Sequence, residues 1–290
     1  MLRRLMLTCC TFFTIVVSAG RGAEDQFFDS NGVKIRYVVE GKGEPVLLIH
    51  GFTINVETQW KAPGIIKELS KDYQVIALDN RGHGKSAKPH ESKKYGREMA
   101  EDAIRLLDHL QIKKAHIVGY SMGGVITVKL LATHPDRFLT ATLGGHGGIK
   151  EGSDTSFYDK LADSLEQGKG LGLMIARLTP PGQPPPSEEQ VKFINAALMA
   201  NNDPKALAAV ARGFKDLMVP WDELEANQIP TLALMGEKDP LKKGVDELKG
   251  RMANLTITVI KDADHGTAFN RPEFIKALKE FLAEHKSPQR

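Results

Sequence analysis

Three polar residues far apart in the sequence have the chemical types of a nucleophile, a base and an orienting acid. Ser121 is the centre of a Gly-x-Ser-x-Gly pattern, within Gly-Tyr-Ser-Met-Gly-Gly at residues 119–124. A serine hydroxyl is a weak nucleophile until a base removes its proton. His265 supplies an imidazole for this purpose, and Asp239 supplies a carboxylate that can orient the ring. Together they predict attack by the serine on a carbonyl carbon.

The sequence around Ser121 predicts a sharp turn between a strand and a helix. An apolar run at 115–118 precedes the serine, and residues with helical spacing follow at 125–131. Gly119 and Gly123 lack the side chains that would collide in such a turn. We therefore expect the hydroxyl at the carboxyl edge of a sheet, beside the positive end of a helix dipole.

The predicted base and acid follow strands of their own. Asp239 comes after the apolar run 231–235, and His265 comes after the run 256–260 and before the final helix. The carboxyl ends of parallel strands meet at one edge of a sheet, so both side chains are expected beside the serine. The order serine, aspartate, histidine is the one used by strand-turn-helix serine hydrolases.

Other residues compete for these roles. His146 follows an expected strand at 139–143, although its glycine-rich surroundings are more typical of a turn near the pocket. Three carboxylates could replace Asp239, namely Glu237, Asp262 and Asp264. The last of them is disfavoured because a residue adjacent to His265 cannot easily turn its side chain onto that ring.

Two backbone N–H groups are candidates to bind the negative charge that develops on the attacked carbonyl oxygen. One belongs to Met122, directly after the serine. The other is assigned to Phe52, in the His-Gly-Phe-Thr segment that follows the apolar run 46–49. Gly51 permits a close approach of this backbone to the substrate.

Strands and helices alternate along most of the chain, which predicts an α/β fold. Short apolar runs without polar alternation are typical of strands buried on both faces of a parallel sheet. They lie at 46–49, 75–78, 115–118, 139–143, 231–235 and 256–260. Asn31 and Gly32 predict a hairpin before them, and Pro272 predicts the start of the final helix.

One segment, residues 145–227, interrupts this alternation with helical patterns alone. It contains a proline-rich stretch at 180–186, a capping box of Ser187 with Gln190, and a second helix start at Asp203. We interpret the segment as a helical lid inserted between two parts of the core, 24–144 and 228–286. A set of ordinary crossover helices is the alternative.

The first residues predict an export signal. Arg3 and Arg4 precede an apolar stretch at 5–17, and small residues follow it, so cleavage is expected after Ala19. Residues 1–19 would then be removed, and the protein would be periplasmic or extracellular. A retained membrane anchor is the alternative, although the apolar run is shorter than the ~20 residues that span a bilayer.

Composition restricts the possible partners. The chain has 290 residues with 41% hydrophobic and 26% charged content, as in ordinary globular enzymes. Without Arg3 and Arg4, 37 basic side chains stand against 36 acidic ones, which gives no reason to expect nucleic acid or an anionic membrane as a partner. Cys9 and Cys10 both lie in the signal, and no metal-ligand spacing is present, so we expect neither metal nor organic cofactor.

These motifs together resemble the α/β-hydrolase superfamily, from about residue 27 to residue 282. The resemblance rests on five features: His-Gly-Phe at 50–52, Asp-Asn-Arg-Gly-His-Gly-Lys-Ser at 79–86, the serine turn, Asp239 and Asp-His-Gly at 264–266. The resemblance is closest to the esterase, lactonase and cofactor-free haloperoxidase-like branch. It implies an eight-stranded, mostly parallel sheet whose second strand is antiparallel, with a lid after the sixth strand, and a supporting role for 79–86.

We therefore expect a serine hydrolase that cleaves a small carboxylic ester or related acyl bond, with a small molecule as its partner. One alternative is a hydrolase that uses the same three residues to cut a carbon–carbon bond beside a ketone. Another is a ligand-binding module on a hydrolase scaffold, although all three site residues are present here. The sequence predicts neither the identity of the substrate nor the oligomeric state.

Overall fold

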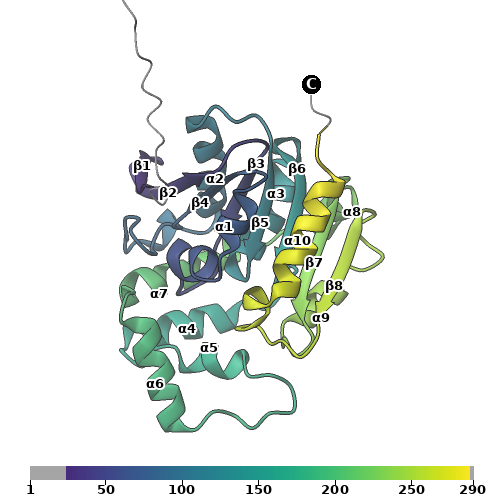
Figure 1. Cartoon of the computed structure of the whole chain (residues 1–290). Coiled ribbons are helices and arrows are strands. Elements are labelled where there is room, and N and C mark those ends of the chain that lie inside the picture. Colours follow the sequence, from purple (N-terminus) through teal and green to yellow (C-terminus); the bar gives the residue numbers. More distant parts are fainter. Residues whose placement is uncertain (1–23, 288–290) are drawn as a thin grey trace, which may run out of the picture.

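The computed structural model describes residues 24–287, and the predicted signal, residues 1–19, lies outside them. Within this range, eight strands form one sheet in the order β1-β2-β4-β3-β5-β6-β7-β8 (Figure 1). Their bounds are β1 Gln26–Asp29, β2 Lys34–Glu40, β3 Pro45–Ile49, β4 Gln74–Leu78, β5 Ala115–Tyr120, β6 Phe138–Gly144, β7 Thr231–Gly236 and β8 Leu255–Ile260. No helix in the same range is long and apolar enough to cross a membrane.

The sheet is mostly parallel, as the sequence predicts. Strand β2 is antiparallel to both β1 and β4. The other six strands, β3 to β8, are all parallel to one another. The hairpin between β1 and β2 turns at Asn31 and Gly32, whose φ angles of 55° and 76° are both positive. The expectation that residues 256–260 are buried on both faces is wrong. Strand β8 pairs only with β7 among the described strands, and Val259 is 44% exposed at this edge.

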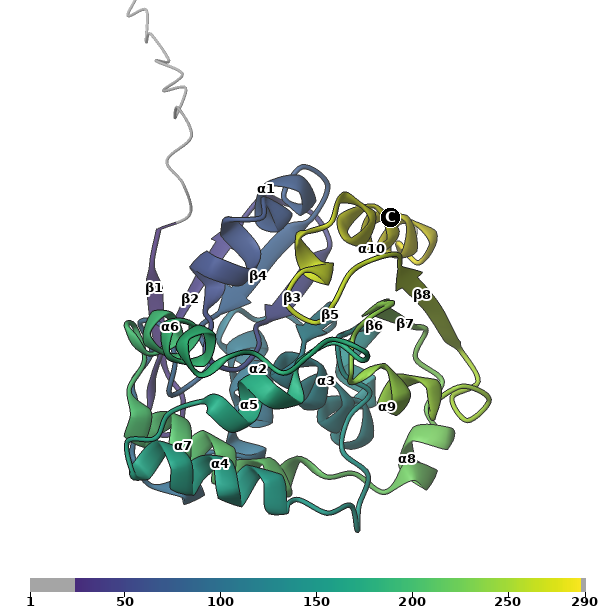
Figure 2. The same ribbon diagram turned by 90° about the horizontal axis from the view of Figure 1, so that it is seen from below.

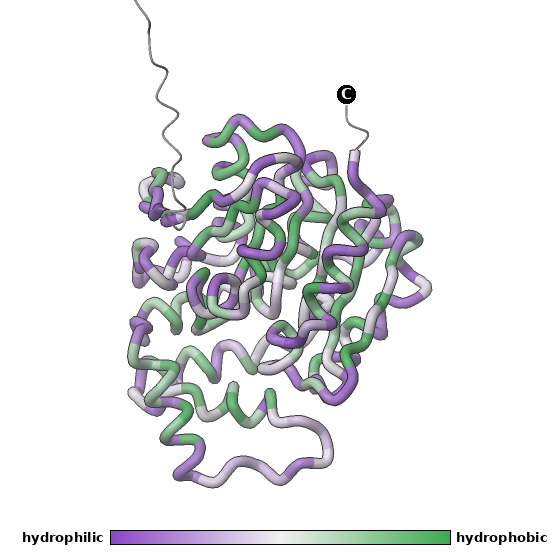
Figure 3. The backbone as a smooth tube through the Cα atoms, viewed as in Figure 1, coloured by the Kyte–Doolittle hydropathy of each residue, from purple (hydrophilic) through white to green (hydrophobic). Residues whose placement is uncertain are grey.

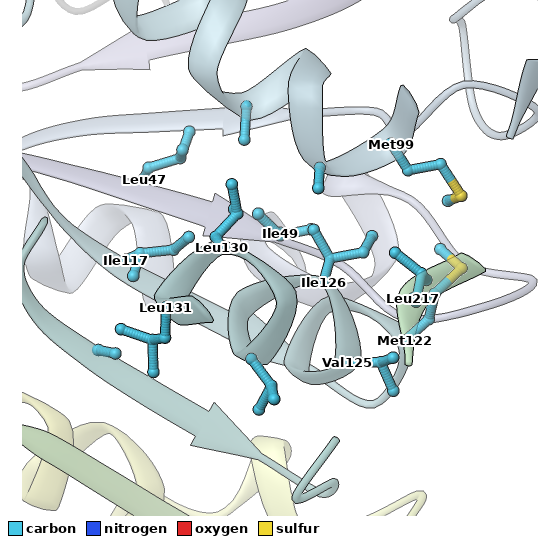
Figure 4. Packing of buried hydrophobic residues seen from close by; sticks show 14 of the residues in the cluster. Leu47, Ile49, Met99, Ile117, Met122, Val125, Ile126, Leu130, Leu131 and Leu217 are labelled. Carbon is cyan, nitrogen blue, oxygen red and sulfur yellow. The ribbon is translucent and has the colours of Figure 1, made fainter. Parts of the chain in front are cut away.

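Helices cover both faces of the sheet (Figure 2). Helices α2 Arg97–His109 and α3 Met122–Thr133 pack on one face, and α1 Ile65–Leu69 and α10 Pro272–Glu284 pack on the other. A hydrophobic core lies between the sheet and the helices on each face, and successive side chains of a strand point into one core and then the other. In β3, Leu47 and Ile49 lie in the core with α3, and Val46 and Leu48 lie in the core with α1. Figure 4 shows Leu47, Ile49 and Ile117 beside Ile126 and Leu130 of α3. This packing fixes the strand ends that hold the polar residues.

Residues 145–227, here called the insertion, contain five α-helices in the described chain and lie at one end of the sheet (Figure 1). They are α4 Ser156–Glu166, α5 Gly172–Arg177, α6 Glu188–Met199, α7 Pro204–Gly213 and α8 Trp221–Glu225. The capping box of Ser187 and Gln190 is present, and the Asp203 side chain caps α7, as predicted. Figure 3 shows the loop between α5 and α6 in white to purple, so its residues are of intermediate to hydrophilic character, whereas the central strands contain long hydrophobic stretches.

The remaining short helices connect these elements. Helix α9 covers Lys242–Asp246, and a single π-helical turn covers Glu57–Lys61. Turns of 3-10 helix lie at Ser92–Lys94, Pro135–Arg137, Phe214–Leu217 and Ala268–Asn270.

Candidate active site

Ser121 lies on a strained turn between β5 and α3. Its φ of 54° with ψ of −114° is a conformation that a residue with a Cβ atom rarely adopts. A Cβ atom added at Gly119 would lie 2.0 Å from the Gly123 carbonyl oxygen, and one added at Gly123 would lie 2.0 Å from the Ile49 carbonyl oxygen. Tight packing around both glycines therefore holds the serine outward from the sheet.

The three predicted side chains form one chain of hydrogen bonds. His265 Nδ1 lies 2.8 Å from Asp239 Oδ2, and His265 Nε2 lies 2.9 Å from Ser121 Oγ. A carboxylate only accepts hydrogen bonds, so Nδ1 carries the ring proton and Nε2 is left to accept the serine hydroxyl. Asp239 is 3% exposed and His265 is 6% exposed, which largely removes water from this chain of hydrogen bonds.

The neighbours of the histidine hold it in place. Tyr120 donates its hydroxyl to the His265 carbonyl oxygen at 2.7 Å. The second oxygen of Asp239 accepts the Leu241 N–H at 2.8 Å, so both carboxylate oxygens have partners. The Tyr120 hydroxyl therefore helps to set the orientation of the imidazole ring, and the Leu241 N–H that of the carboxylate.

The competing carboxylates are engaged elsewhere in the described chain. Glu237 accepts the Asp262 N–H, and Asp262 pairs with Lys238. Asp264 accepts the N–H groups of residues 266 and 267, which closes the loop around His265. Asp239 is thus the carboxylate that contacts the imidazole.

His146 lies near Ser121 but is not part of this chain of hydrogen bonds. Its Nδ1 accepts the Gly148 N–H at 3.0 Å, so in the neutral ring the proton is on Nε2. Burial, followed by the nearby His265 and Arg177, lowers the pKa of His146 to about 3. A ring that stays neutral at ordinary pH can donate a hydrogen bond to a ligand but is a poor base.

The loop that carries Phe52 lies directly beside the serine. A Cβ atom added at Gly51 would lie 3.2 Å from the Cβ atom of Ser121. The N–H of Gly51 is bonded to Gln59 Oε1 at 2.8 Å, whereas the N–H groups of Phe52 and Met122 donate to no residue of the described chain. Both of the amides predicted for the oxyanion are therefore free for a ligand.

A buried histidine supports this loop. His50 Nε2 accepts the Asn80 N–H at 2.9 Å, and its Nδ1–H donates to the Gly51 carbonyl at 2.7 Å. Burial lowers the pKa of His50 to about 4, so the ring stays neutral in this position. Its role is to fix the backbone beside the serine.

Two cavities meet at the site. The inner cavity, of about 60 Å³, is lined by Phe52, Ser121, Met122, His146, Phe157, Tyr158, Leu161, Met174, Arg177, Leu178, Phe214 and Leu241. The outer groove, of about 900 Å³, is formed by α5, the proline-rich loop, α6 and residues 264–266. Met174 of α5 and Leu178, which directly follows this helix, line both, so the end of α5 separates them.

Sequence reasoning found only part of the cavity lining. Phe157, Leu161 and Met174 of the insertion line the inner cavity, whereas Leu173 is 43% exposed. Arg177 was missed, although an isolated cation in the otherwise apolar run 171–178 was a usable signal. Within residues 24–287, no group of three or more histidine, cysteine or acidic side chains could hold a metal ion.

A family model described as alpha/beta hydrolase fold matches residues 44–272, most of the chain. The protein therefore belongs to the α/β hydrolase fold family and is a hydrolase of that class. This confirms the resemblance and the fold class that the motifs predict.

Relatives with curated names match the chain over different lengths. The dihydrolipoyllysine-residue acetyltransferase component of the acetoin cleaving system from Cupriavidus necator is 35% identical over 133 residues, 46% of this chain and 34% of the relative. The putative 2-succinyl-6-hydroxy-2,4-cyclohexadiene-1-carboxylate synthase of Bacillus subtilis is 26% identical over 267 residues, 86% of this chain and 95% of the relative. The first match thus spans about a third of that relative's own length.

Solved structures share the fold over nearly the whole chain. A structure described as Est816, an N-acyl homoserine lactone degrading enzyme, is similar with a TM-score of 0.69 and 27% identity. The similarity covers 88% of this chain and 100% of that chain.

Proposed function

We propose that this protein is a serine hydrolase that cleaves a small carboxylic ester or a related acyl bond at Ser121. The observation that carries the proposal is the continuous hydrogen-bond chain from the serine hydroxyl through His265 to Asp239. Both cavities reach it, the inner one at Ser121 and the outer one at His265. A substrate can therefore contact the nucleophile and the base at the same time.

The reaction follows from these contacts. His265 Nε2 takes the proton of Ser121 as Oγ attacks the carbonyl carbon, and Asp239 stabilises the positively charged imidazole that forms. The imidazole then gives its proton to the leaving oxygen, and an acyl-enzyme remains on the serine. Water repeats the two steps, which releases the acid and restores the hydroxyl.

The free N–H groups of Phe52 and Met122 are the proposed donors to the oxygen that becomes negative. Each such donor contributes about 3 kcal/mol to the stability of the transition state in comparable sites. Their supporting contacts are the tight approach of Gly51 to Ser121 and the hydrogen bonds of His50.

Two further observations agree with acyl chemistry. The solved enzyme with 27% identity is described as degrading N-acyl homoserine lactones, and a lactone is a cyclic ester. The insertion, residues 145–227, supplies α5 between the two cavities, as a lid over the substrate would.

The test is turnover of 4-nitrophenyl butyrate by purified protein that begins at residue 20. The Ser121→Ala variant should lose nearly all activity, with kcat reduced by about 10⁴-fold or more, because no other described hydroxyl receives help from His265. Circular dichroism of the variant checks that it is folded. Similar turnover by a folded Ser121→Ala protein would refute the proposal.

A further inference from the structure

The inner cavity contains one formally charged side chain. Twelve described residues line this cavity; none of them is acidic, and the cation is Arg177 at the end of α5. Its guanidinium carbon lies 4.4 Å from the centre of the Phe157 ring, which holds the side chain in place. Arg177 forms no ion pair with any residue of the described chain. Arg177 is exposed, and an unpaired cation beside a small, mostly apolar cavity can bind an anion.

Two neutral donors accompany this cation. His146 carries its ring proton on Nε2, since its Nδ1 accepts a backbone N–H. Tyr158 stacks on Phe214 with ring centres 4.4 Å apart, and its hydroxyl bonds to no other residue in the described chain. Burial raises the pKa of Tyr158, so the hydroxyl keeps its proton and can donate it to an acceptor.

Acidic groups lie beyond the cavity without neutralising Arg177. A third cavity of about 300 Å³ adjoins the inner one and shares Arg177, His146 and Tyr158 with it. Asp154 and Glu247 line this third cavity, but neither pairs with the guanidinium in the described chain. Asp154 instead accepts the N–H and the hydroxyl of Ser156. The cation is therefore available to a ligand.

The chemistry of the proposed reaction assigns one half of the substrate to each cavity. The leaving oxygen must receive a proton from His265, and His265 lines the outer groove but not the inner cavity. Ser121, Phe52 and Met122 line the inner cavity. The acyl group therefore occupies the small inner cavity, and the leaving alcohol occupies the open groove of about 900 Å³.

We propose that the substrate is a half-ester of a short dicarboxylic acid, whose free carboxylate is bound by Arg177. The inference rests on the proposed function of Ser121. The bond between Ser121 Oγ and the ester carbon forms as the bond from that carbon to the alcohol oxygen breaks. The serine proton moves through His265 to the alcohol, and water then releases the dicarboxylic acid. The mostly apolar lining of the groove fits a bulky apolar alcohol.

The experiment compares two esters of equal shape, benzyl hydrogen glutarate and its neutral amide, benzyl glutaramate, by release of benzyl alcohol. The wild type should show a higher kcat/KM for the half-ester. In Arg177→Met the ratio of the two kcat/KM values should fall roughly 10- to 100-fold, because a hydrogen bond to a charged group is lost. In Arg177→Lys, which keeps the positive charge, the ratio of the two kcat/KM values should fall less than in Arg177→Met.

Arg251→Met is the matched control, because Arg251 also lies over an aromatic ring, that of Trp221, but lines none of the three cavities. Its ratio should equal that of the wild type. A wild type that cleaves both esters equally, or an Arg177→Met ratio that is unchanged, would overturn the inference and leave the serine mechanism standing. Cleavage of neither ester by a protein that still turns over 4-nitrophenyl butyrate would also overturn the inference alone. Equal cleavage of the half-ester by Ser121→Ala would overturn the serine mechanism and the inference with it.

Discussion

At the scale of single residues, burial decides which histidines around the site can exchange protons. His50, His83 and His146 all have pKa values lowered to about 3 or 4, chiefly by burial. His265 differs because its two ring nitrogens contact a carboxylate and the serine hydroxyl. The neutral rings fix the backbone and the cavity wall, so His265 is the one suited to carry a proton in the proposed reaction.

The buried His83 predicts loss of stability in acid. Its ring packs against Phe52, and burial lowers its pKa to about 3, whereas the unfolded chain has a value near 6.5. Between these two values the unfolded state binds one more proton than the folded state. The free energy of unfolding therefore falls as pH decreases, by about 1.4 kcal/mol per pH unit for this group.

Urea unfolding at pH 7 and pH 5 measures this effect. His83→Gln should lose less stability between the two pH values than the wild type does, by about 1 to 2 kcal/mol. His90→Gln is the control, because the side chain of His90 is 52% exposed. An equal pH dependence in His83→Gln and the wild type would show that His83 is not buried in its neutral form.

At the scale of elements, the turn from β5 to α3 combines strain at one residue with close packing at its neighbours. The positive φ of Ser121 is maintained because Gly119 and Gly123 let backbone atoms approach where a side chain would collide. Strain and close packing at this turn thus set the position of the proposed nucleophile.

Gly119→Ala should be strongly destabilising, by roughly 3 kcal/mol, because its methyl group would meet the rigid backbone of Gly123. Thermal unfolding measures the loss. Gly172→Ala in α5 is the matched control, since the nearest atom there, from Val191, lies 3.6 Å away. It should leave stability unchanged or slightly raised. Equal melting temperatures for Gly119→Ala and the wild type would contradict the tight packing of this turn.

The elements of the core were predictable because their signals are local. Apolar runs marked six of the eight strands in the described chain, and Asn31-Gly32 marked the hairpin formed by the other two. The edge position of β8 had a local signal that was overlooked, since Thr256 and Thr258 alternate with apolar residues in Leu-Thr-Ile-Thr-Val-Ile, as in a half-exposed strand. Which strand lies at an edge depends on the pairing of the whole sheet.

At the scale of the whole molecule, strands distant in the sequence bring three residues to one edge of the sheet. The topology of a parallel sheet made this convergence predictable, because Ser121, Asp239 and His265 each follow the end of a strand. The cavities were not predictable in the same way. Arg177 and Tyr158 reach the inner cavity through the packing of α4 and α5, and no spacing in the sequence encodes that packing.

The most direct test of the central claim is covalent labelling by a fluorophosphonate, followed by mass spectrometry of the digested protein. The wild type should carry one adduct, on Ser121, and Ser121→Ala should carry none. Asp239→Asn should be labelled much more slowly, because an amide in place of the carboxylate no longer fixes the proton of His265 on Nδ1. An adduct on another residue, or labelling of Asp239→Asn at the rate of the wild type, would contradict the account.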